Sequence, residues 1–221
     1  LQRQALIDAA ALANVDLAGL VSDGVAVGIN YANSPAAKLD QRIVVYDLGA
    51  SAASATLLNL QDLEGNVEIT VEGYGSDTLT SGQSLTLLLR ELLLHKFNKE
   101  QEKKYHPEAE RTPRLLNRIW REAERAKQVL SANNEVHVHM ENLADDEDLS
   151  VKITREEFEK EAEWQRQRVV QPLLTAVQNL PKKIDSIDQV VLVGGASRTP
   201  FVIEALKNLV GEQKLSRNVN A

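Results

Sequence analysis

The segment 189–200 constrains the fold of this chain most strongly. Residues 190–193 are apolar without a polar break, and three of the four are β-branched, a pattern typical of a strand buried on both faces. Gly194 and Gly195 follow, and glycines at a strand end allow a sharp turn and a close approach to a ligand. Ligands of open α/β sheets bind beyond the carboxyl ends of strands. The segment therefore predicts an α/β protein with a candidate site after this strand, although a plain strand–helix connection remains an alternative.

A helix is expected to follow this turn. Ser197 is a candidate N-cap, and Pro200 suits the first helical turn because its missing N–H has no partner there. Arg198 lies between them, beside the glycine turn.

Composition excludes several classes of protein. The chain has 221 residues and 43% hydrophobic residues, enough for a substantial core. Its formal charge of −7 argues against nucleic acid as the main partner. No stretch approaches the ~20 apolar residues of a membrane helix, so no membrane association is expected. The chain opens in a helical pattern without an initiating Met, so we expect it to be a piece of a longer protein.

Further elements follow from local patterns. Strands are predicted at 15–21, 43–46, 55–60, 67–71 and 135–140, and helices at 4–13, 79–97 and 114–131. Asp23 is expected to cap a helix, and Thr154 with Glu157 forms a capping box for a helix running towards residue 180. The segments 95–111 and 141–149 read as a charged crossover and an acidic loop. Segments 37–80 and 163–221 are expected to share a mixed sheet, with 81–162 as an inserted, mainly helical subdomain.

Three groups of residues offer chemistry. Asp47 closes a strand before a turn of small residues, where backbone amides can face an anion and a carboxylate can hold hydrated Mg²⁺. A second group has i, i+3, i+4, i+7 spacing, which places it on one helix face opposite the apolar stripe, suited to hydrogen bonding a ribose or purine. It comprises Glu124, Lys127, Gln128 and Ser131. The third is the glycine pair with Arg198. An ordinary hairpin and a solvated helix face are the alternatives for the first two.

Together these groups resemble the nucleotide-binding domain of the seventy-kilodalton heat-shock protein family. The segments that carry the resemblance are Gln2-Arg-Gln-Ala5, Val44-Val-Tyr-Asp-Leu-Gly49, Glu124-Arg-Ala-Lys127 with Leu130-Ser131, and Val193-Gly-Gly195 with Arg198 and Pro200. They occur in order along the whole chain. Leu130-Ser-Ala-Asn133, the acidic loop after Glu141, Asp23 and Asn218-Val-Asn-Ala221 resemble the large endoplasmic-reticulum, glucose-regulated branch.

The resemblance implies an actin-like, ribonuclease-H-like ATPase fold, of which this chain is mainly the second lobe, with residues 1–36 the end of the first. It implies ATP or ADP with Mg²⁺, Asp47 acting on the metal and its water. Asp23 belongs to the implied nucleotide site, with Gly49, Ala50, Ser51 and Gly82 near phosphate. The remaining implied nucleotide contacts are Glu124, Lys127, Gln128, Ser131, Gly194, Gly195 and Arg198.

Departures from the family pattern predict weak hydrolysis. Ala50, Ser51 and Ala52 replace Gly, Gly and Thr of the family hairpin, and each added Cβ narrows the approach to phosphate. Gln128 replaces an Arg that stacks on adenine, and Ala196 replaces a Ser that touches the base.

The implied function is that of an ATP-binding chaperone or nucleotide exchange factor in the lumen of the endoplasmic reticulum, with the cytoplasm as second choice. Its implied partners are a chaperone of the same family and unfolded polypeptides bound through a region outside this chain. An actin-fold sugar kinase and a filament-forming actin relative are the rival interpretations.

Overall fold

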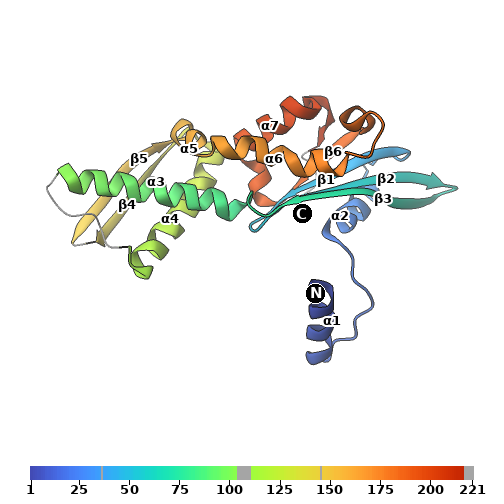
Figure 1. Cartoon of the computed structure of the whole chain (residues 1–221), viewed down its shortest axis with the longest axis horizontal. Helices are drawn as coiled ribbons and strands as arrows, with labels where there is room; N and C mark the ends of the chain where they lie inside the picture. The colour runs from blue at the N-terminus through green and yellow to red at the C-terminus, as the bar shows by residue number, and fades with distance from the viewer. Residues whose placement is uncertain (36, 104–110, 145, 217–221) are drawn as a thin grey trace.

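The computed structural model describes residues 1–35, 37–103, 111–144 and 146–216. A five-stranded sheet of order β3-β2-β1-β6-β7 forms one end of an elongated molecule (Figure 1). Its strands are β1 (Gln41–Leu48), β2 (Ala53–Leu63), β3 (Asn66–Asp77), β6 (Gln189–Val193) and β7 (Leu215–Ser216). The first three are antiparallel neighbours, whereas β6 pairs in parallel with both β1 and β7. The α/β fold class predicted from the sequence is confirmed.

Strands β1 and β6 are buried on both faces because helices cover each side of the sheet. On one face, Val44, Tyr46 and Val190 pack beneath α6 (Glu163–Ala176) and α7 (Pro200–Val210). On the other face, Val45 and Val191 pack with Tyr31 of α2 (Asp23–Ala32). The Tyr46 hydroxyl donates a 2.7 Å hydrogen bond to the Val169 carbonyl, which satisfies a polar group inside the core.

Helix α6 lies unusually close to the edge strand β3. A Cβ added at Gly73 would lie 1.9 Å from the Ala176 carbonyl oxygen, and one at Gly75 would lie 2.1 Å from the Pro172 carbonyl oxygen. Both glycines therefore serve the packing of helix on sheet, because any side chain would push α6 away.

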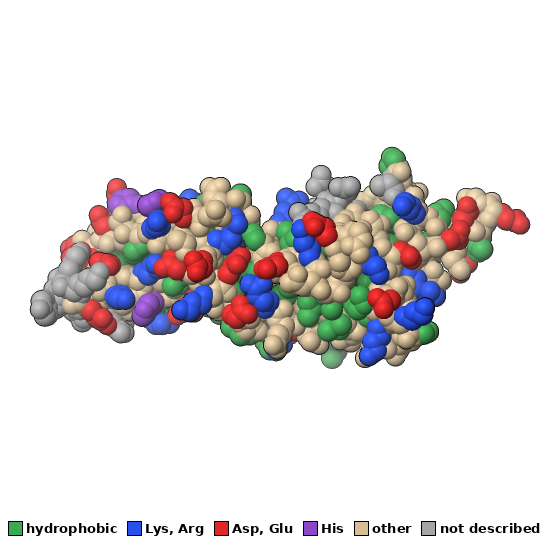
Figure 2. Space-filling view, turned by 90° about the horizontal axis from the view of Figure 1, so that it is seen from above, with side chains coloured by type: hydrophobic (Ala, Val, Ile, Leu, Met, Phe, Trp, Pro, Cys, Tyr) green, Lys and Arg blue, Asp and Glu red, His purple; other side chains and the backbone are tan. Residues whose placement is uncertain are grey.

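The second unit extends from the sheet along α3 (Gly82–Lys103), which leads away from the strands in Figure 1. It also contains α4 (Pro113–Ala132), the two-stranded sheet of β4 (Glu135–Ala144) and β5 (Glu147–Thr154), and α5 (Arg155–Glu161). The predicted apolar stripe of α4 is buried, and the predicted capping box of Thr154 and Glu157 is present. In Figure 2, charged side chains of both signs are interspersed over this end of the molecule, as on a solvated surface.

The N-terminal part packs loosely. Helix α1 (Gln2–Leu12) buries none of its residues and projects away from the sheet (Figure 1). Helix α2 instead contacts the sheet closely, because Gly24 and Gly28 let its backbone approach Thr56 and Leu58.

Several boundaries differ from the sequence-based expectations. Residues 15–21 form no strand, and the helix at 79–97 begins at Gly82 and continues to Lys103, into the predicted crossover. The rest of that crossover, 104–110, lies outside the described residues. The predicted acidic loop is largely a hairpin, because β4 extends to Ala144 and β5 begins at Glu147. The helix expected from Thr154 towards residue 180 is two helices, α5 and α6, separated at Ala162.

Two predicted helix caps are also wrong. Asp23 is the first residue of α2, whose N-cap is Ser22. Ser197 lies in a 3₁₀ turn, η2 (Gly195–Arg198), and α7 begins after Thr199 with Pro200 in its first turn. Two further 3₁₀ turns are η1 (Lys183–Ser186) and η3 (Glu212–Lys214). Within the part of the chain that the structure describes, no helix combines the length and apolar character needed to cross a bilayer.

We expect Gly75→Ala to lower the free energy of unfolding by about 1–3 kcal/mol, because the new methyl group overpacks the contact between β3 and α6. Urea unfolding of the chain measures the effect. Gly19→Ala is the matched control, because a Cβ at Gly19 meets nothing within 4 Å. Equal stability of the two variants would contradict the close packing of α6 on β3.

Candidate functional site

The carboxyl ends of β1 and β6 meet at the edge of the sheet that faces the second unit. The parallel register pairs Asp47 with Val193, so Gly194 lies directly beside Asp47. Gly194 has a φ of +83°, and a Cβ there would lie 2.4 Å from the Leu48 carbonyl oxygen and 2.5 Å from Asp47 Oδ1. Only glycine fits this position, both for its backbone conformation and for its neighbours.

The turn after β1 is closed on itself. The Gly49 N–H donates to the Ala52 carbonyl at 3.1 Å. Every residue of this turn, Gly49 included, has a negative φ, so Ala50, Ser51 and Ala52 are accommodated without backbone strain.

The turn also caps the N-terminus of α3. The N–H groups of Gly82 and Gln83 donate to the carbonyls of Gly49 and Ala50, at 2.8 and 2.9 Å. Those of Ser84 and Leu85 donate to the Ser81 hydroxyl and carbonyl. Helix N-termini bind anions through free N–H groups. Since the first four amides of α3 all have partners within the protein, this helix end offers no open anion site.

One face of α4 borders the same region. Glu124 is half-buried, Gln128 is exposed, and the Ser131 hydroxyl donates to the Lys127 carbonyl at 3.0 Å. The expectation that the whole face lies opposite the apolar stripe is wrong for Lys127. Its ammonium is buried against α3, where it donates to Gly82 O, Thr86 Oγ1 and Glu124 Oε2 at 2.9, 2.7 and 2.8 Å.

These elements enclose a cavity of about 690 Å³ at the junction of the two units, which we call the central cavity. It brings together residues from four segments of the chain: the turn after β1, the start of α3, one face of α4, and the stretch from η2 to Thr199. Nine of the sequence-predicted site residues line it: Gly49, Ala50, Gly82, Glu124, Lys127, Gln128, Ser131, Gly195 and Arg198. Asp23, Asp47, Ser51 and Gly194 are outside its lining.

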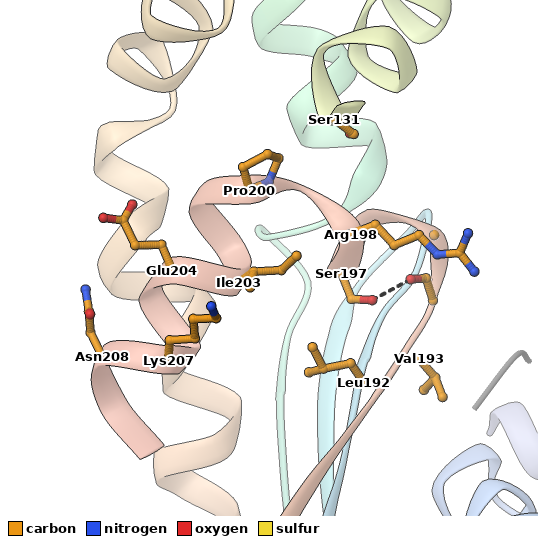
Figure 3. A pocket seen from close by; sticks show the side chains of 12 residues that line it. Ser131, Leu192, Val193, Ser197, Arg198, Pro200, Ile203, Glu204, Lys207 and Asn208 are labelled. Atoms are coloured by element: carbon orange, nitrogen blue, oxygen red, sulfur yellow. Dashed lines mark hydrogen bonds between the residues drawn. The ribbon is translucent and has the colours of Figure 1, made fainter. Parts of the chain in front are cut away.

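A second cavity of about 650 Å³ adjoins it and is drawn in Figure 3. Its walls include Leu192, Ile203 and Gly194, and the Ser197 hydroxyl donates to the Gly194 carbonyl at 2.7 Å. Arg198 lines both cavities, and Figure 3 shows its guanidinium group directed away from Ile203.

The pKa values of Asp47 and Glu124 are shifted in opposite directions. Burial, and the negative charge of Asp23, raise the pKa of Asp47 above its usual value. Burial acts in the same direction on Glu124, but the hydrogen bonds from Lys127 and Thr86 outweigh it, so the pKa of Glu124 lies below its usual value. Glu124 is therefore an anion at neutral pH and a hydrogen-bond acceptor only.

Sequence inspection missed four residues of this region. Trp120, Gln83 and Thr199 line the central cavity, and Thr86 is fully buried behind it. Trp120 precedes Glu124 by one helical turn, so the spacing that selected the α4 face could have included it. Thr86 carries no such signal, because its role depends on the packing of α3 against α4.

Asp47→Asn is expected to raise the free energy of unfolding at pH 7, because it removes a carboxylate whose ionised form the fold disfavours. The sign follows from the raised pKa: the advantage of the variant is present above the folded pKa of Asp47. It disappears as the pH falls towards the ordinary value of about 3.9. Urea unfolding across this pH range tests it, with the exposed Asp16→Asn as control. An Asp47→Asn variant less stable than the wild type at pH 7 would contradict the raised pKa of Asp47.

Comparison with known proteins covers the whole chain. A model of the family described as Hsp70 protein matches residues 1–221. The heat shock protein 70 homolog LHS1 of Candida glabrata is 38% identical over 100% of this chain and 26% of its own length. Hypoxia up-regulated protein 1 is 33% identical over 100% of this chain, which covers 23% of the human protein and 35% of the Xenopus laevis protein. The chain thus spans about a quarter of the length of LHS1. On these matches and the fold described above, the chain belongs to the Hsp70 family, as its motifs predict.

Proposed function

We propose that this chain is the second lobe of a two-lobed domain that binds adenine nucleotide. One observation carries the proposal: four separate segments, the turn after β1, the start of α3, the α4 face and η2, converge on the central cavity. The cavity presents an anionic carboxylate, a hydroxyl and a guanidinium, the kind of few polar groups that orient a nucleoside in a ligand pocket.

Each residue then has a separate role. Arg198 would stack on the base, because a planar, weakly hydrated guanidinium packs well on an aromatic ring. Glu124 would accept hydrogen bonds from ribose hydroxyls, as acidic residues do in other nucleotide sites. Gly49 and Gly82 would lie towards the phosphates. Lys127 would act on the ligand through Glu124, since its own ammonium protons have partners in the protein.

The residues at the sheet edge fit a hydrated Mg²⁺ ion. Asp47 is half-buried with a raised pKa, and the carboxylate of Asp23 contributes to that shift, so a cation there would relieve the repulsion. Oxygen donors that act through water are typical of Mg²⁺ sites in proteins. When bound, the ion would supply positive charge next to the phosphates. Asp47 would orient its water molecules.

The end of the central cavity formed by the turn after β1 and the start of α3, where the phosphates would lie, favours nucleotide binding over hydrolysis. Phosphoryl transfer depends on charge stabilisation and positioning at the phosphates. The amides at the start of α3 are engaged by the turn after β1, and that turn carries Ala50 and Ser51 in place of the family's glycines. We therefore propose slow hydrolysis in the complete protein and a structural use of the nucleotide, as in a nucleotide exchange factor.

The cellular role follows from family membership and from the relatives. We propose that the complete protein is an ATP-binding chaperone or exchange factor of the endoplasmic reticulum lumen. It would act with a chaperone of the same family and bind unfolded polypeptides through a region outside this chain. Membership of the Hsp70 family favours this function over a sugar kinase or an actin-like filament.

Gln128→Arg should tighten adenine nucleotide binding by roughly two- to thirty-fold, because a second guanidinium on the base adds about 0.5–2 kcal/mol. Gln128 is exposed on α4 and outside the apolar stripe, so the helix should tolerate the change. Arg198→Ala should weaken binding by a similar factor, because it removes the guanidinium from the other face of the base. Calorimetry with ADP on the two-lobed domain measures both effects, and Gln167→Arg on α6 is the matched control for added charge.

The two variants separate the possible failures. Unchanged affinity in Gln128→Arg, with loss in Arg198→Ala, would contradict stacking on both faces of the base. If neither substitution alters ADP binding, α4 and η2 do not line the nucleotide site, and the proposed function loses its structural basis.

A further inference from the structure

The ammonium group of Lys127 has no proton left for a ligand. An ammonium carries three protons, and the three acceptors around Lys127 Nζ are Gly82 O, Thr86 Oγ1 and Glu124 Oε2, all within 2.9 Å. Its side chain is only 11% exposed. A ligand could accept from Lys127 only if one of these bonds were broken, in a site where a lost partner is costly.

The Thr86 hydroxyl completes this network. It accepts from Lys127, so its own single proton can go to one of two acceptors, the Gly82 carbonyl at 3.0 Å or Glu124 Oε2 at 2.5 Å. The carboxylate is closer and charged, and hydrogen bonds to charged acceptors are the stronger ones. Thr86 therefore donates to Glu124.

The consequence is an asymmetric carboxylate. Glu124 Oε2 accepts from Lys127 and Thr86, whereas the contact of Oε1 among the described residues is the Gln128 amide at 3.5 Å, the limit of a hydrogen bond. Oε2 anchors the side chain, and because Glu124 lines the central cavity, Oε1 is the oxygen left for a ligand there.

We propose that Thr86 is a positioning residue that determines selectivity for ribose. By holding Oε2, it fixes the rotation of the Glu124 carboxylate so that Oε1 meets a ligand hydroxyl. Without it, the carboxylate turns about its last bond and Lys127 alone restrains it. This inference rests on the proposed function, because it needs a nucleoside in the central cavity, and it adds to that function the residue that selects for the sugar hydroxyls.

The test compares ADP with its 2′-deoxy and 3′-deoxy forms by calorimetry on the two-lobed domain. Wild type is expected to prefer ADP over at least one deoxy form by about ten-fold, the value of one hydrogen bond to a charged group. Thr86→Val, which keeps the shape and removes the hydroxyl, should weaken ADP binding about ten-fold. The affinity for that deoxy form should change little. The ratio of the two affinities, ADP over the deoxy form, should therefore fall from about ten towards one. Thr86→Ser should restore the preference to within about two-fold of wild type.

Thr80→Val is the matched control. Thr80 is also fully buried near the start of α3, but its hydroxyl has no hydrogen-bond partner among the described residues. The same substitution there should leave both affinities unchanged. If Thr86→Val proves too unstable to measure, Thr86→Ala replaces it, with the same expected loss of ribose preference.

The outcomes distinguish this inference from the function on which it rests. A Thr86→Val protein that keeps the wild-type preference for ADP overturns it. An equal loss of affinity for ADP and for both deoxy forms in Thr86→Val also overturns the inference, because a hydroxyl that only supports the fold would weaken all three ligands alike. Wild type that binds ADP without any ribose preference overturns the role of Thr86 and leaves the proposed function standing. Wild type that binds no adenine nucleotide overturns both.

Discussion

The parallel pairing of β1 with β6 is the interaction on which the rest of the structure depends. It joins two segments that are far apart in sequence, and it brings Asp47 and Gly194 to the same edge of the sheet. The two apolar cores lie on opposite faces of this pair, so the pairing also organises the burial of α2, α6 and α7. The site is consequently a product of the complete fold: neither the turn after β1 nor η2 could form a ligand surface alone.

The start of α3 connects this sheet edge to the second unit. The Gly82 N–H donates to the turn after β1, and its carbonyl accepts from Lys127 on α4. A Cβ at Gly82 would lie 3.2 Å from the Gly49 carbonyl oxygen, so the contact is tight. One residue therefore links the sheet, α3 and α4. A change in the angle between the two units must alter the contacts of Gly82, and with them the position of Glu124.

Local patterns predicted the features that depend on neighbouring residues alone. The strand at 190–193, the stripe of α4 and the capping box of α5 are of this kind. The predicted strand at 15–21 failed because a strand needs a partner, and none of the strands that the structure describes pairs with this segment. The acidic loop failed because Asn142 and Asp146 adopt positive φ, which these residue types tolerate, and so permit a tight hairpin. The prediction that Lys127 lies on an open helix face was wrong because its ammonium is buried against Thr86 and Gly82. These residues approach Lys127 only in the tertiary fold.

The two ends of the central cavity differ in a way that bears on function. At the end formed by the turn after β1, the amides of α3 are already paired with carbonyls of the protein, so a phosphate would find few free donors there. At the end formed by α4 and η2, one carboxylate oxygen and the exposed Arg198 are available. In the proposed nucleotide complex, the contribution of this chain to the binding free energy would come mainly from contacts with the nucleoside, because among the described residues the groups that can meet a ligand lie at that end. A nucleotide bound mainly through its nucleoside has few charged or hydrogen-bonding partners at its phosphates. Rapid hydrolysis requires such partners to stabilise the charge that develops at phosphorus. This distribution of donors and acceptors suits a protein in which bound nucleotide holds two lobes together more than one that turns it over.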